Sequence, residues 1–170
     1  MEQLTPAIAV HAVAAAYVLL LGPAQILRRR RDLAHRILGT TWLVAMLTVC
    51  ISSFWVMHDG FSWLHGLSIW TLVCMVAAMV GIRAGIVEVH RGFMVGSYVG
   101  TLIAFAFAAL VPVRLIPQLL RSEPLVVGVT ALGVGVLVLV VHLSVVRAFG
   151  RERRAAAAQG TARPLRRAGA

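Results

Sequence analysis

Two pairs of histidines at nearly equal spacing are the residues of this sequence best suited to chemistry. His11 precedes His35 by 24 positions, and His65 precedes His90 by 25. All four lie near the ends of long apolar segments, where ionisable side chains are costly and commonly functional. The second pair follows the first at offsets of 54 and 55 residues, which indicates a repeated two-helix unit. Because imidazole binds haem iron, this pattern favours a metal-binding helical bundle.

The composition indicates an integral membrane protein. The chain is 60% hydrophobic and 13% charged, with a mean hydropathy of +0.89, whereas an average soluble domain has about 25% charged residues. A single water-soluble core of 170 residues could not bury this much apolar surface. No basic segment precedes the first apolar run, so no cleavable signal peptide is expected. Cys50 and Cys74 lie in separate apolar runs and are interpreted as small buried hydrophobic residues.

The apolar segments predict an all-α bundle of five transmembrane helices, because a bilayer core requires about 20 apolar residues per helix. The predicted spans are residues 6–27, 35–57, 62–82, 90–113 and 125–146. They form one domain, residues 1–147, with a four-helix core of two repeated hairpins and a fifth helix. Residues 148–170 form a basic tail that we expect to be disordered beyond its first turn.

The arginines predict the orientation in the membrane. All 16 basic residues are arginine, and placing the N-terminus outside puts 14 of them on the cytoplasmic face, leaving only Arg114 and Arg121 outside. Cytoplasmic loops carry an excess of basic residues, so the count predicts an N-out, C-in protein. The same clustering at segment ends argues against nucleic acid as a partner.

This orientation sorts the histidines into two layers, with His11 and His65 near the outer face and His35 and His90 at the cytoplasmic edge. A parallel repeat would place the first helix opposite the third, and the second opposite the fourth. We therefore predict two b-type haems, with His11 and His65 as iron ligands of the outer haem. His35 and His90 would ligate the inner one.

Two arginines directly follow the inner histidines. Arg36 and Arg91 are predicted to pair with haem propionates, and Gly39 and Gly92 would leave room for a flat macrocycle. A plainer alternative is that the histidines are half-solvated in the headgroup region and that the His-Arg pairs are topology anchors. His58 is expected to face solvent. The interpretation of His142 stays open between the inner layer and a bond to a neighbouring carbonyl.

Residues 8–115 resemble a bacterial multi-pass membrane family named domain of unknown function 2306. Its first motif reads Gly-Pro-x-Gln followed by His-Arg-x-x-Gly, and its second reads His-Arg-Arg-Trp-Met followed by Ser-Tyr and a distal arginine. Gly92 and Phe93 depart from the second motif. The matching residues are Gly22, Pro23, Gln25, His35, Arg36, Gly39, His90, Arg91, Met94, Ser97, Tyr98 and Arg114.

The resemblance implies a multi-pass protein of the bacterial inner membrane and supplies no activity. The histidine layout is also similar to the cytochrome b561-type core, in which helices one and three hold one haem and helices two and four the other. That similarity is one of pattern, and the fold alone does not give function.

Three functions are compatible with these features. The first is di-haem transmembrane electron transfer, from a quinol or small reductant to an acceptor or partner subunit. The second is a non-catalytic membrane subunit or assembly factor without a cofactor. The third is a transporter of a small solute or metal, although the absence of intramembrane carboxylates counts against it. Expected partners are the lipid bilayer, a quinone, a partner subunit or a second copy of the chain. No hydrolase motif is present, so the sequence leaves open whether the protein is an enzyme.

Overall fold

The computed structural model describes residues 5–28, 31–56, 60–112 and 115–161, and these ranges contain helices and no strand. Five helical segments of this described part are long and apolar enough to cross a membrane. This result confirms the predicted all-α membrane bundle. The elements are α1 (Pro6–Leu27), α2 (Leu33–Ser52), the 3-10 turn η1 (Ser53–Trp55), α3 (Trp63–Arg83), α4 (Val87–Leu110), α5 (Leu115–Ser122) and α6 (Pro124–Thr161).

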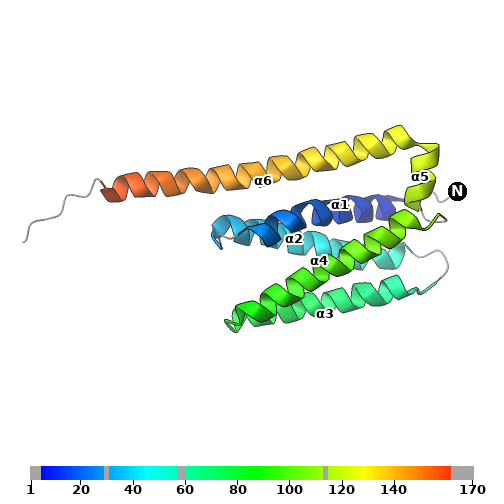
Figure 1. The fold of residues 1–170 in the computed structure, drawn as a ribbon, viewed down its shortest axis with the longest axis horizontal. Helices are drawn as coiled ribbons and strands as arrows, with labels where there is room; N and C mark the ends of the chain where they lie inside the picture. Colours follow the sequence, from blue (N-terminus) through cyan, green and yellow to red (C-terminus); the bar gives the residue numbers. More distant parts are fainter. Residues whose placement is uncertain (1–4, 29–30, 57–59, 113–114, 162–170) are drawn as a thin grey trace, which may run out of the picture.

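Helices α1 to α4 form a ring in which each helix packs against its two neighbours (Figure 1). The contacting pairs are α1 with α2, α2 with α3, α3 with α4, and α4 with α1. Among the described residues, the backbones of the diagonal pairs, α1 with α3 and α2 with α4, make no contact. Helix α6 packs outside this ring against α1 and α2. The ring thus sets α2 diagonally opposite α4, which is the arrangement that the repeat predicts.

Both hairpin turns lie at the same end of the bundle (Figure 1). We call this end, which carries Arg28, Arg36, Arg83 and Arg91, the basic end. The opposite end carries η1 and α5. The assignment of the basic end to the cytoplasm stays a prediction.

Local capping explains why α2 and α4 begin earlier than predicted. The Asp32 side chain accepts a hydrogen bond from the His35 backbone N–H at 3.1 Å, so α2 begins at Leu33 rather than at His35. At the end of α3, Gly85 has φ +78° and the Ile86 N–H donates to the Gly81 carbonyl at 2.8 Å. This is a Schellman motif, which ends α3 and lets α4 begin at once.

The segments beyond α4 differ from the prediction in two places. The expected loop 114–124 contains the short helix α5, followed directly by α6. Helix α6 continues to Thr161, past the end of its membrane span at Ala148, whereas the sequence predicts a tail that is disordered beyond its first turn. Residues 155–158 are four consecutive alanines, the best helix formers, which favours this continuation. Residues 162–170 of the predicted tail lie outside the described part.

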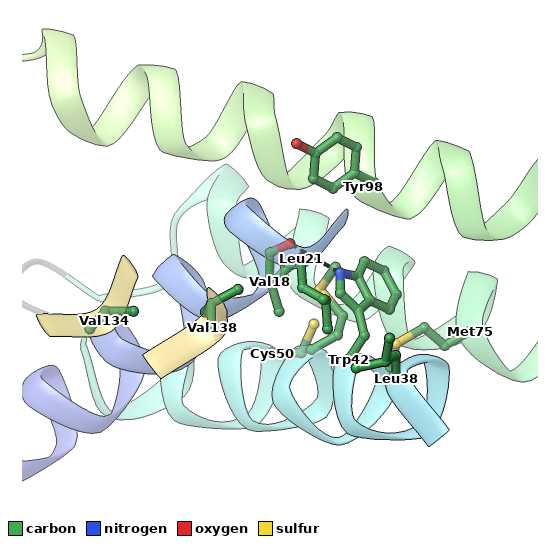
Figure 2. Close-up of a cluster of buried hydrophobic side chains, with 10 residues drawn as sticks. Val18, Leu21, Leu38, Trp42, Cys50, Met75, Tyr98, Val134 and Val138 are labelled. Atoms are coloured by element: carbon green, nitrogen blue, oxygen red, sulfur yellow. Dashed lines mark hydrogen bonds between the residues drawn. The ribbon is translucent and has the colours of Figure 1, made fainter. Parts of the chain in front are cut away.

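The buried core is centred on α1 and α2, and buried residues of α3, α4 and α6 pack against them (Figure 2). Two aromatic side chains donate hydrogen bonds to consecutive carbonyls of α1. The Trp42 Nε1–H donates to the Val18 carbonyl at 3.0 Å, and the Tyr98 hydroxyl donates to the Leu19 carbonyl at 3.2 Å. Each aromatic ring therefore fills the core while its polar atom is satisfied, as a membrane interior requires.

The Gly22–Pro23 pair explains why Tyr98 binds at this level. Pro23 lies inside α1 and has no N–H, so the Leu19 carbonyl, four residues earlier, lacks its usual helical donor. The Tyr98 hydroxyl takes the place of that donor. A Cβ atom at Gly22 would collide with the Tyr98 ring. Gly22 and Pro23 therefore both allow Tyr98 to join the first hairpin to the second.

Candidate functional site

The predicted outer pair does not present two free ring nitrogens. His11 lies with its Nδ1 3.0 Å from the Ser52 hydroxyl oxygen. That hydroxyl donates to the Thr48 carbonyl at 2.5 Å, so it accepts from the His11 Nδ1–H. The Nε2 atom of His11 then carries the lone pair.

His65 performs a structural task at the start of α3. Its Nδ1 accepts a hydrogen bond from the Ser62 backbone N–H at 2.9 Å, and its Nε2–H donates to the Ser53 carbonyl at 3.2 Å. His65 thus replaces the glutamate or glutamine of a capping box. His65 is 5% exposed, and the centroid of its ring lies 5.7 Å from that of Phe54 and 5.4 Å from that of Phe61. Because both nitrogens are engaged, His65 offers no lone pair to iron in this conformation.

His35 lies at the basic end, where Gln25 of α1 holds it by two bonds. The Gln25 amide N–H donates to the His35 carbonyl at 3.2 Å, and its Oε1 lies 3.2 Å from His35 Nδ1. The first bond fixes the orientation of the amide, so Oε1 must accept from Nδ1–H. His35 therefore carries its lone pair on Nε2.

His90 reaches the same state by a different contact. Its Nδ1 lies 3.1 Å from the Ala78 carbonyl of α3, which can only accept, so Nδ1 is protonated. Gly81 allows this close approach, because a Cβ atom there would lie 2.8 Å from the Val89 side chain and 3.3 Å from the His90 backbone nitrogen. His90 therefore also carries its lone pair on Nε2.

The two inner histidines lie at the same end of the bundle, on diagonally opposite helices. His35 lies in the first turn of α2 and His90 in the first turn of α4, and the sharing of one iron by these two residues stays a prediction. Neither Nε2 atom is hydrogen-bonded to a residue that the structure describes. A ring with Nδ1–H held by an oxygen and Nε2 left free is the usual state of a metal-ligating histidine.

The other predicted members of the site take different positions. Arg36 and Arg91 are exposed at the basic end, and their pairing with propionates stays a prediction. A Cβ atom at Gly39 would make an ordinary contact, 3.8 Å from the Gln25 amide nitrogen, and one at Gly92 would meet no atom within 4 Å; the space for a macrocycle beside these glycines stays a prediction. Two shallow surface grooves, of ≈ 590 and ≈ 350 Å³, are lined by none of the four paired histidines.

The remaining histidines do not extend the pair. In the described part of the chain, no group of three or more histidine, cysteine, aspartate or glutamate side chains could hold a metal ion. The Nδ1 atom of His142 in α6 is buried without a hydrogen-bond partner, so the expected bond to a carbonyl is not formed there. His58 and Arg114 lie outside the described residues.

Sequence reasoning missed the roles of Gln25 and Tyr98. Both belong to the family pattern, but their contacts join residues 10 and 79 positions apart, which no local spacing reveals. The available signals were a proline inside an apolar span and a glutamine near its end, because both leave backbone or side-chain polar groups that need partners in a membrane.

Comparison with known proteins gives one family. No curated protein and no solved structure matches the chain, and the likeness to a cytochrome b561-type core stays a prediction. The family model for predicted membrane proteins, DUF2306, matches residues 8–146, which extends the resemblance seen in the sequence through most of the fifth span. The chain therefore belongs to the DUF2306 family of multi-pass membrane proteins.

Proposed function

We propose that this protein is a membrane electron carrier that holds one b-type haem between His35 and His90 at the basic end. The observation that carries the proposal is the shared state of the two rings. Each has Nδ1–H held by an oxygen from the preceding helix, and each leaves Nε2 free. Histidine ligands of haem iron are normally oriented in this way by a second hydrogen bond.

The small number of ligands favours haem over a bare metal ion. Zinc and similar ions take four ligands in proteins, usually histidine, cysteine or carboxylate. Among the described residues no third such group joins the two histidines. Haem brings four nitrogen ligands of its own, so two imidazoles complete its coordination.

The roles of the protein groups follow from their positions. His35 and His90 would hold the iron from α2 and α4, and the exposed guanidinium groups of Arg36 and Arg91 would neutralise the propionates at the membrane surface. The bound group would supply one-electron exchange.

The proposal is limited to one haem because the outer pair is not equivalent. His65 would have to give up its bonds to Ser62 and Ser53 before it could bind iron. Leaving these buried polar groups unpaired would cost roughly 1–3 kcal/mol for each.

Absorption spectroscopy tests the proposal. Protein purified from cells supplied with haem should contain one haem per chain and show the sharp reduced α band of a b-type cytochrome. His35→Gln and His90→Gln should each abolish this band, because glutamine cannot replace the imidazole nitrogen.

Matched substitutions at the opposite end provide the control. His11→Gln and His65→Gln should retain the full band under the one-haem proposal, whereas the two-haem prediction requires both to lose half of it. A folded but colourless wild-type protein would contradict both, and would favour the non-catalytic membrane subunit.

A further inference from the structure

Gln25 makes two hydrogen bonds to a single residue of the neighbouring helix. Its amide nitrogen donates to the His35 carbonyl, and its oxygen accepts from the His35 ring, both at 3.2 Å. A side-chain amide bound at both ends cannot rotate without losing both bonds. Its orientation, and with it the protonated nitrogen of His35, is therefore fixed.

Three neighbouring residues, Gly39, Asp32 and Arg28, surround or support this contact. Gly39 lies beside the Gln25 amide, since a Cβ atom there would be 3.8 Å from the amide nitrogen. Asp32 accepts from the His35 backbone N–H at 3.1 Å. Arg28 in turn binds both carboxylate oxygens of Asp32, at 2.9 and 3.0 Å. The ring and the backbone of His35 are both held before any ligand binds.

The two histidines differ in how they can be altered. The acceptor for His90 is the main-chain carbonyl of Ala78, which no substitution removes. The acceptor for His35 is a side chain, and it is uncharged. A substitution at position 25 therefore acts on one ring and leaves the other as an internal reference.

We propose that Gln25 is a positioning residue that makes Nε2 the ligating atom of His35 and keeps this ligand neutral. The inference rests on the proposed function. Hydrogen bonding to the distal ring nitrogen tunes both the basicity of a histidine ligand and the potential of the metal. A carboxylate at position 25 would pull the Nδ1 proton towards itself and stabilise oxidised iron, whereas the amide avoids this effect.

The first experiment requires no haem. Nitrogen-15 NMR of the histidine rings in haem-free protein should show Nδ1-protonated signals for His35 and His90. Gln25→Leu should shift the His35 signals alone, while Gln118→Leu, a matched change in α5 at the opposite end, should shift neither. Unchanged His35 signals in Gln25→Leu would overturn the inference, whatever the haem content.

The second experiment uses the haem-loaded protein. Gln25→Leu should weaken haem retention by roughly 10- to 100-fold, as loss of a partner hydrogen-bonded to a metal ligand commonly does. The nearly isosteric Gln25→Glu should keep the haem and lower its reduction potential. An unchanged potential in Gln25→Glu would overturn the tuning role. Wild-type protein without haem would end the proposed function, yet the NMR comparison would still decide whether Gln25 sets the ring.

Discussion

At the residue scale, the four paired histidines are distinguished by their hydrogen bonds. The rings of His11, His35 and His90 are protonated at Nδ1, whereas His65 accepts at Nδ1 and donates from Nε2. In residue type and in sequence spacing the four histidines are alike. The difference arises from the groups that bond to each ring, and it leaves Nε2 without a proton in His11, His35 and His90.

The capping role of His65 leads to a prediction about stability. His65→Ala should lower the free energy of unfolding by about 1–2 kcal/mol, because α3 loses its cap and the Ser53 carbonyl loses its donor. His65→Gln should recover most of this loss, since glutamine is a usual residue at this position of a capping box. Denaturant unfolding in detergent, followed by circular dichroism, measures both variants. Equal destabilisation by the two substitutions would contradict the capping role.

The sequence could supply part of this residue-scale description. The repeat predicts the pairing of His35 with His90, and the structure places both residues in the first turn of their helices at the basic end; their joint binding of a metal stays a prediction. The spacing from Ser62 to His65 also matches a capping box, but glutamate or glutamine usually fills the final position. The Gln25 contact was not predictable, because it depends on how α1 and α2 pack.

At the element scale, α1 is the helix on which the two hairpins meet. Pro23 leaves the Leu19 carbonyl without its helical donor, and Gly22 leaves space for an aromatic ring. The Tyr98 hydroxyl of α4 donates to that carbonyl, and the Tyr98 ring fills that space. Hydropathy predicted where the spans lie, because length and apolar content determine them. It could not predict the early starts of α2 and α4, which depend on the Asp32 cap and the Gly85 turn.

The link between Pro23 and Tyr98 predicts a non-additive pair of substitutions. Tyr98→Phe should cost about 0.6 kcal/mol, a typical value for a hydrogen bond between membrane helices. In a Pro23→Ala background it should cost less, because the new backbone N–H can bond to the Leu19 carbonyl. A double-mutant cycle based on unfolding free energies measures the coupling. Equal costs in both backgrounds would show that the proline does not create the need for the tyrosine.

At the scale of the whole molecule, four helices form a ring, α6 packs against one side, and the two hairpin turns share one end (Figure 1). The repeat in the sequence predicted the ring. Helix α5 and the extension of α6 were not predictable from hydropathy, because neither spans the membrane and each depends on local helix propensity.

The distribution of arginines predicts the topology of the full chain. A fluorescent protein fused after residue 170 should fluoresce, and alkaline phosphatase fused at the same position should be inactive, because the basic end is expected to face the cytoplasm. The same two reporters placed before Met1 should give the reverse pattern. An active phosphatase at the C-terminus would reverse the assignment of both ends.

The proline in α1 also provides a vibrational reporter inside the bilayer. Most helical carbonyls accept from a backbone amide, but the Leu19 carbonyl accepts from a phenol of another helix. A carbon-13 label at this one position would therefore absorb in the infrared at a frequency that reflects the phenol bond. Any separation of the hairpins would change that frequency, so their movement could be followed without attaching a dye.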